Sequence, residues 1–286
     1  MKPMVESFFD EATSTFSYVV YEATGSKAII IDPVLGYDNR TGRTSTKFIE
    51  QIIYFTKQRN LTIEWILETH AHADHLTAAP YLKEKLGGKI AIGSRIKEIQ
   101  KVFKKTFNLG DFFNVEGAQF DYLLQEDEEI VFGNLKFKVL FVPGHTPACV
   151  AYEVGDAIFV GDTLFMPDIG TARCDFPGGD AKSLFHSIQK ILSRPDHTRL
   201  FMCHDYSYTS RAVAHETTVL EQKKKNIHIH EGVDEEAFVS MRTIKDKTLD
   251  MPLLIIPSIQ VNINAGYLPP KEENGVAYLK IPLNLF

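Results

Sequence analysis

The segment Thr69-His70-Ala71-His72-Ala73-Asp74-His75 constrains the fold of this chain more than any other feature of its sequence. It brings three imidazoles and one carboxylate together over a few residues. The apolar and β-branched residues 63–68 before it predict a strand, and residues 76–86 after it predict a helix that ends at Gly87. The motif is therefore expected on a turn at the C-terminal end of a strand, where open α/β sheets place their binding sites.

The polar side chains of this motif predict a metal site. His70 and His72 are two residues apart, so they point to the same side of an extended segment. Asp74 and His75 follow the turn and are expected to face the same pocket from another direction. A helix-capping Asp74 beside surface histidines explains each residue alone, but the density of the group favours metal binding.

Three other predicted strand ends carry residues of the kind that bind metals. His145 lies in Pro-Gly-His-Thr, Asp162 in Val-Gly-Asp-Thr and His204 in Cys-His-Asp-Tyr. Each residue alone has an ordinary structural explanation, whereas four such strand ends together predict one metal centre along the edge of two helix-covered sheets. Asp32 ends another predicted strand, and its sequence allows either a pocket residue or a turn-forming Asp-Pro pair.

The rest of the chain shows neither an internal repeat nor a clear linker. The polar residues 36–45 predict a loop, and the tail after Asp250 predicts strands and turns. Hydrophobic periodicity predicts strands over residues 7–9, 15–21, 27–31, 89–92, 149–153, 157–160 and 199–202, a hairpin over 129–142, and helices over 46–59, 96–107, 182–193, 212–224 and 235–247. We expect a single domain over residues 1–286, with residues 211–286 as a helical and irregular extension packed on it.

The composition is typical of a soluble globular protein and disfavours several classes of function. The 286 residues are 44% hydrophobic and carry a net charge of −6, without the basic run expected for a nucleic-acid partner. No apolar stretch approaches the roughly 20 residues of a membrane span, and the first residues lack a targeting signal. The separated cysteines Cys149, Cys174 and Cys203 favour a reduced, cytoplasmic protein that binds neither nucleic acid nor membrane.

The order Thr-His-x-His-x-Asp-His, Pro-Gly-His-Thr, Gly-Asp-Thr and His-Asp-Tyr resembles the metallo-β-lactamase superfamily over about residues 7–210. The resemblance implies an α/β fold, the αββα sandwich, in which two mixed β-sheets are flanked by helices and hold one or two metal ions. Within the superfamily, residues 31–35, 161–165 and 170–176 are most similar to the persulfide dioxygenases, in particular their bacterial subgroup.

That resemblance implies a non-haem iron dioxygenase that oxidises the sulfane sulfur of glutathione persulfide, or of another low-molecular-weight persulfide, with O₂ to sulfite in sulfide detoxification. One Fe(II) per chain is expected on His70, His145 and Asp162, the two-histidine, one-carboxylate set of such oxygenases. The remaining motif residues are then outer-shell groups or ligands of a second metal: His72, Asp74, His75 and His204. The resemblance also implies that Arg173 binds the carboxylate of the thiol carrier, that Tyr206 is a polar contact in the pocket, and that the enzyme is a homodimer.

A zinc-dependent hydrolase of glutathione thioesters, similar to glyoxalase II, is the main alternative. In that enzyme class all seven side chains hold one or two zinc ions, with Asp162 as the bridge, and an activated water attacks the thioester. The C-terminal sequence argues against it, because residues 223–225 are its only basic cluster and the tail does not predict a helical glutathione-binding domain. A closed structural zinc site is disfavoured as well, since such sites are usually rich in cysteine. Cys174 is either a reactive thiol of the substrate loop or a packing residue.

Overall fold

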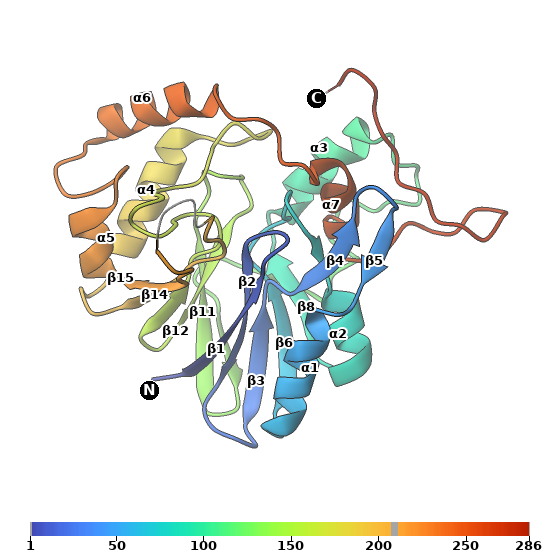
Figure 1. The fold of residues 1–286 in the computed structure, drawn as a ribbon, viewed down its shortest axis with the longest axis horizontal. Helices are drawn as coiled ribbons and strands as arrows, with labels where there is room; N and C mark the ends of the chain where they lie inside the picture. The colour runs from blue at the N-terminus through green and yellow to red at the C-terminus, as the bar shows by residue number, and fades with distance from the viewer. Residues whose placement is uncertain (1, 207–210, 286) are drawn as a thin grey trace.

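Two six-stranded sheets pack face to face, with helices over both outer faces, in the computed structural model, which describes residues 2–206 and 211–285 (Figure 1). The first sheet has the strand order β1 (Met4–Asp10), β2 (Thr15–Tyr21), β3 (Lys27–Ile31), β6 (Thr62–Glu68), β8 (Lys89–Gly93) and β9 (Tyr122–Leu124). Strands β1 to β3 pair antiparallel, whereas β3, β6, β8 and β9 pair parallel.

The second sheet is mixed as well. Its strand order is β10 (Glu129–Phe132), β11 (Leu135–Phe141), β12 (Val150–Val154), β13 (Ala157–Phe159), β14 (Arg199–Phe201) and β15 (Glu216–Thr218). Strands β13 and β14 pair parallel, and the other neighbours pair antiparallel. The predicted αββα sandwich of two mixed sheets is therefore confirmed.

Apolar side chains fill three layers of this sandwich. Between the sheets lie fully buried residues such as Ile29, Phe137 and Phe159. On the outer face of the first sheet pack α1 (Ile49–Gln58), α2 (Ala79–Leu86), α3 (Ile96–Thr106) and α7 (Ile255–Asn262). On the outer face of the second sheet pack α4 (Ala181–Leu192), α5 (Val219–Lys225) and α6 (Glu235–Asp246). Figure 1 shows the two groups of helices on opposite sides of the molecule.

Residues 36–45, predicted as a loop, belong instead to a small hairpin. Strand β4 (Val34–Asp38) pairs with β5 (Arg43–Ser45) and with β7 (Leu76–Thr77), so the helix expected from residue 76 begins later, as α2. The polar residues form the turn between β4 and β5. In this turn the Asp38 carboxylate accepts hydrogen bonds from the backbone N–H of Arg40 and the hydroxyl of Thr41.

The C-terminal part also differs from the prediction. Residues 216–218, expected inside a helix, form the edge strand β15, and α5 begins only at Val219. The tail predicted as strands and turns contains the helix α7. Its β-branched residues favour strands, but residues 257–262 are all buried, and such packing overrides intrinsic propensity. Among the described residues, no helix combines the length and apolar character needed to cross a bilayer.

Candidate metal centre

Four strands deliver the predicted ligands to one edge of the sandwich. Strand β6 leads to His70, β11 to His145, β13 to Asp162 and β14 to His204. The turn before His145 depends on Gly144, which has φ +148° and at which a Cβ would lie 2.4 Å from the backbone of α4. All seven side chains predicted as ligands or outer-shell groups come together in two adjoining clusters.

His70, His145 and Asp162 form the first cluster. Asp162 Oδ2 lies 3.8 Å from His70 Nε2 and 3.7 Å from His145 Nε2. These separations are too long for hydrogen bonds. They suit side chains that converge on a shared ion, because N and O ligands about 2.1 Å from a metal stand about 3–4 Å from one another.

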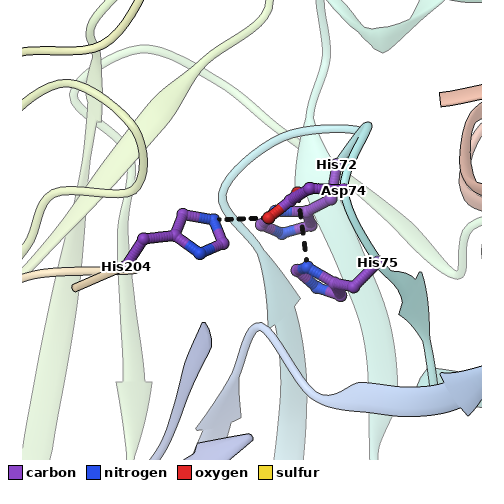
Figure 2. A group of neighbouring side chains, drawn as sticks. All are labelled: His72, Asp74, His75 and His204. Atoms are coloured by element: carbon purple, nitrogen blue, oxygen red, sulfur yellow. Dashed lines mark ion pairs between the residues drawn. The ribbon is translucent and has the colours of Figure 1, made fainter. Parts of the chain in front are cut away.

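His72, Asp74, His75 and His204 form the second cluster, drawn in Figure 2. Asp74 lies between two of the histidines, with Oδ2 3.1 Å from His204 Nε2 and Oδ1 3.5 Å from His75 Nδ1. Asp162 connects the clusters, because its Oδ1 lies 3.3 Å from His204 Nε2 while its Oδ2 faces the first cluster.

Hydrogen bonds select histidine tautomers whose free lone pair faces the clusters. His145 Nδ1 donates to a backbone carbonyl oxygen at 2.8 Å, and His72 Nε2 donates to the Asp32 carboxylate at 3.0 Å. The single proton of the Thr69 hydroxyl is donated to Asp32, so this hydroxyl accepts from His70 Nδ1 at 3.0 Å. The second nitrogen of each ring is left for another partner, as in metal-bound histidine.

Several buried polar atoms at this site have no hydrogen-bond partner within the described residues. Six of them belong to the clusters: His70 Nε2, His72 Nδ1, His75 Nε2, His204 Nε2, Asp74 Oδ2 and Asp162 Oδ1. Leaving a buried polar atom unpaired costs about 1–3 kcal/mol, and a bound cation removes that cost for the whole set. The residues present therefore fit one or two metal ions, and imidazole with carboxylate suits iron and zinc alike.

Asp32 forms hydrogen bonds that hold the ligand segment in place. The sequence allowed either a pocket residue or a turn-forming Asp-Pro pair, and these hydrogen bonds favour a role at the site. Asp32 is buried with φ +49°, and it accepts hydrogen bonds from Thr69 N at 2.7 Å and His72 Nε2 at 3.0 Å. Burial raises the pKa of Asp32, but His72 and Thr69 outweigh burial and hold this pKa below its usual value. Burial lowers the pKa of His72, but the carboxylates of Asp32 and Glu68 outweigh burial and raise this pKa above its usual value.

Helix α7 supports the motif through Asn262, which is buried. The Asn262 carboxamide donates to the carbonyl oxygens of His72 at 2.8 Å and His75 at 2.7 Å, and it accepts from Thr77 N at 2.9 Å. Sequence reasoning missed this residue, because the tail predicted a strand and the contact joins positions 190 residues apart.

A pocket of about 390 Å³ opens beside the clusters and includes Asp74, His145 and Asp162 in its lining. Its walls are mainly apolar: Phe165, Ile169, Ala172, Phe176, Ile227, Leu249 and Pro252. Its polar side chains include Asp168, Arg173, Tyr206, Arg242 and Lys245. A larger groove beside α1 contains none of the seven ligand residues, so the smaller pocket is the one that serves the clusters.

Arg173 and Tyr206, the predicted substrate contacts, both line this pocket. The Arg173 guanidinium is already held by the Asp175 carboxylate, with Nε and Nη2 each donating at 2.6 Å, while Nη1 donates to a backbone carbonyl oxygen. The backbone carbonyl of Arg173 is the acceptor for His145 Nδ1. Tyr206 stacks on His204, with ring centroids 5.4 Å apart.

The basic residues of the C-terminal part lie in unexpected places. Lys223 and Lys225 pair with neighbouring carboxylates on the outside of α5. Arg242 and Lys245 of α6 line the pocket instead, and no sequence motif marked them. With the helical α7, they remove the sequence-based objection to a hydrolase that binds glutathione.

The three cysteines are buried and free, which favours packing roles over reactive ones. Burial raises the pKa of Cys149 to about 12. Burial also raises the pKa of Cys174 and of Cys203 far above the range in which a thiolate forms at neutral pH.

Comparison with known proteins identifies the family. The family model described as the Metallo-beta-lactamase superfamily matches residues 11–204, which contain all seven ligand residues. The chain belongs to this superfamily. The two clusters lie within the matched segment and are groups of residues that could hold metal ions.

Proteins named for different activities are similar in sequence to this member of the metallo-β-lactamase superfamily. A probable metallo-hydrolase of Burkholderia pseudomallei is 52% identical over 98% of this chain and 99% of its own. Glyoxylase B2 of Dictyostelium discoideum is 48% identical over 99% of this chain and 98% of its own. Human mitochondrial persulfide dioxygenase ETHE1 is 29% identical over 76% of this chain and 74% of its own. The crystal structure of ETHE1 from Myxococcus xanthus is 27% identical with a TM-score of 0.73, over 92% of this chain and 100% of that one.

Proposed function

We propose that this chain is a mononuclear iron persulfide dioxygenase, which oxidises the terminal sulfur of a small thiol persulfide. The overall reaction is RSSH + O₂ + H₂O → RSH + SO₃²⁻ + 2 H⁺. The observation that carries the proposal is the first cluster, in which His70, His145 and Asp162 converge beside the pocket. Two histidines and one carboxylate are the donor set of non-haem iron oxygenases, and iron held there supplies the redox chemistry for O₂.

The residues around the first cluster have positioning roles in this proposal. The carbonyl of Arg173 orients the His145 ring, and Phe176 meets that ring edge-on at 5.2 Å. The aromatic and aliphatic pocket walls keep water from the reacting sulfur. Arg173 and Tyr206 remain the predicted contacts of the thiol carrier. The resemblance to ETHE1, over 76% of this chain for the human sequence and 92% for the Myxococcus xanthus structure, supports the same choice.

A metal-dependent thioester hydrolase is the second candidate. The second cluster adds four ligand side chains, and Asp162 lies between the clusters, as a two-metal hydrolase requires. The Burkholderia relative, which is 52% identical to this chain, is named a probable metallo-hydrolase, and the Dictyostelium relative, which is 48% identical, is named glyoxylase B2. We favour the dioxygenase because the ETHE1 structure from Myxococcus xanthus, with a TM-score of 0.73, aligns over 92% of this chain and over all of its own.

Two assays, one on the iron form and one on the zinc form of the protein, separate the candidates. Protein purified anaerobically and loaded with Fe(II) is expected to hold about one iron per chain, as in two-histidine, one-carboxylate oxygenases. It is expected to consume O₂ and form sulfite only when glutathione persulfide is added. Fast hydrolysis of S-lactoylglutathione by the zinc form, without persulfide-dependent O₂ uptake, would contradict the dioxygenase and support the hydrolase.

We also propose a homodimer, which rests on the family resemblance. Light scattering coupled to size-exclusion chromatography is expected to give twice the chain mass of 32.4 kDa. A single-chain mass at micromolar concentration would contradict the dimer.

A further inference from the structure

A small cavity lies next to the first cluster, on the side of α3 and α7. Its volume is about 20 Å³, and His145 of the first cluster is part of its lining. A single water-sized sphere occupies about 10–15 Å³, so the cavity has room for one small molecule. Its walls are mainly apolar side chains from the metal motif, α3 and α7, and those that concern us are all buried: Ala71, Ala73, Ile99, Phe103, Ile255 and Ile259.

The alanines of the metal motif leave space for this cavity. Ala71 and Ala73 line it, whereas the histidines of the motif belong to the two clusters. Helices α3 and α7 cover the alanines and lie side by side (Figure 1), where the buried Gln100 donates from Nε2 to the carbonyl oxygen of Ile263 at 2.8 Å. Because an alanine methyl group is short, the side chains of the two helices do not fill the space in front of it.

The cavity offers little to a water molecule. Its two polar side chains already have partners. His145 Nδ1 donates to a backbone carbonyl oxygen at 2.8 Å, and its Nε2 faces Asp162 within the first cluster. Thr146 Oγ1 accepts from the backbone N–H of Ala148 at 3.2 Å and lies 3.1 Å from Cys149 Sγ. Since an ordered water needs about two to four polar partners, the cavity favours a small apolar molecule.

A thin wall separates the cavity from the pocket beside the clusters. Ala73, His145 and Phe176 line both spaces. The Phe176 ring is held in this wall, because it meets the His145 ring edge-on at 5.2 Å and the Arg173 guanidinium lies 5.1 Å from its centroid. Among the described residues, no Lys, Arg, Asp or Glu lines the cavity, whereas Arg173 and other charged side chains line the pocket. The two spaces therefore suit different molecules, and both adjoin His145.

We propose that this cavity binds molecular oxygen and supplies it to the first cluster. O₂ is small, uncharged and apolar, so it favours a dry apolar space of this size over water, as xenon does. This inference rests on the proposed function and gives the second substrate of that reaction a site of its own. A thiol carrier in the pocket then leaves the O₂ site free, because the wall of Ala73, His145 and Phe176 lies between them.

Nuclear magnetic resonance of the zinc-loaded protein, which is diamagnetic, tests the site with O₂ itself. O₂ is paramagnetic and speeds the relaxation of nearby methyl groups, so rates of ¹³C-labelled isoleucine methyl groups are compared under O₂ and under N₂. The enhancement is expected to be several-fold larger at Ile99, Ile255 and Ile259 than at Ile53 and Ile63. These two controls are similarly buried in the same core and lie outside the cavity lining. Equal enhancement at all five overturns the proposal.

A filled cavity tests the supply of O₂. Ile259→Phe puts a larger side chain into the cavity, and Ile53→Phe is the matched control in the same core. In Ile259→Phe the enhancement at Ile99 is expected to fall to the level of Ile63. The KM for O₂ of the iron-loaded variant is expected to rise about 3- to 10-fold, with the KM for glutathione persulfide as in the wild type. Ile53→Phe is expected to match the wild type in both KM values. The wild-type relaxation experiment decides the matter even where an overpacked core fails to fold.

Failure of this proposal is distinguishable from failure of the proposed function. Equal relaxation enhancement in an enzyme with persulfide-dependent O₂ uptake overturns the O₂ site and keeps the dioxygenase, as does an unchanged KM for O₂ in folded Ile259→Phe. Selective enhancement at the three cavity isoleucines, in a protein without persulfide-dependent O₂ uptake, keeps the O₂ site and overturns the dioxygenase.

Discussion

The carboxamide of Asn262 bridges the turn that carries the metal ligands, with Nδ2 2.8 Å from the carbonyl oxygen of His72 and 2.7 Å from that of His75. Because Asn262 is buried, water cannot replace these hydrogen bonds. They fix the backbone between His72 and His75, and with it the direction of the side chains of the second cluster. A residue of the last helix thus belongs to the support of a site whose ligands all precede residue 205.

The first prediction concerns this support. Asn262→Ala leaves two buried carbonyl oxygens and one N–H without partners, so we expect the free energy of unfolding to fall by about 2–4 kcal/mol. Urea denaturation measures this loss. Asn264→Ala is the control, because Asn264 is only partly buried and, within the described residues, its side chain bonds only to the nearby Tyr267 carbonyl. Equal stability of the two variants would refute the supporting role.

The second prediction concerns the carboxylate behind the ligands. Asp32→Asn removes the negative charge that accepts the Thr69 hydroxyl proton, so this hydroxyl is no longer fixed as the acceptor for His70 Nδ1 and the His70 ring loses its fixed tautomer. We expect iron affinity to fall by about 10- to 100-fold, as for other partners of metal-bound histidine. Competition with a chelator measures this affinity, and Asp38→Asn in the exposed β4–β5 turn is the control. An unchanged affinity would show that Asp32 does not support the iron site through Thr69 and His70.

The third prediction separates the two clusters. Under the dioxygenase proposal, His70→Ala is expected to lose iron and activity together, because this ring belongs to the first cluster. His204→Ala is expected to keep about one iron per chain, as expected for a single-iron oxygenase. Metal analysis of both anaerobic proteins, alongside the wild type, gives the result. Two metals in the wild type and one in His204→Ala would favour the two-metal hydrolase.

The fourth prediction is a pH dependence of stability. The pKa of buried His228 is about 4, below its value of about 6.5 in the unfolded chain, so the unfolded chain binds the proton more readily. Stability from this group is therefore fully present above about pH 6.5 and is lost as the pH falls towards 4. We expect a loss of about 1–2 kcal/mol once solvent screening is allowed for. His228→Gln should show a shallower decline than His186→Gln, an exposed control, in urea titrations at pH 4–7.

The fifth prediction concerns the thiols. Cys149, Cys174 and Cys203 are buried, and burial raises the pKa of each, so the reactive thiolate is scarce at neutral pH. Native protein at pH 7.5 is expected to resist iodoacetamide, whereas urea-unfolded protein should be modified at all three. Mass spectrometry of intact chains counts the modifications. Rapid labelling of Cys174 in native protein would restore the alternative of a reactive thiol in the substrate loop.

The ligands were predictable because their chemistry and their place at strand ends are both local properties of the sequence. His145 and Asp162 follow turn glycines after apolar runs, and the structure brings both to His70. Helix α7 was not predictable, because a helix buried on nearly every side has no amphipathic stripe. The cavity beside His145 had no signal either, since it depends on how α3 and α7 pack against the metal motif. Local patterns predicted the side chains that converge in the two clusters, and missed the long-range contacts that hold those side chains in place.

The contact between α7 and the metal motif determines at which stage of protein synthesis the metal site can be completed. The superfamily match ends at residue 204, so a nascent chain carries every ligand well before Asn262 leaves the ribosome. Until then the turn from His72 to His75 lacks its buried amide, and its carbonyl oxygens are open to water. The metal centre is therefore finished late in synthesis, and a chain cut between residues 205 and 262 would keep every ligand and lose the geometry that they need.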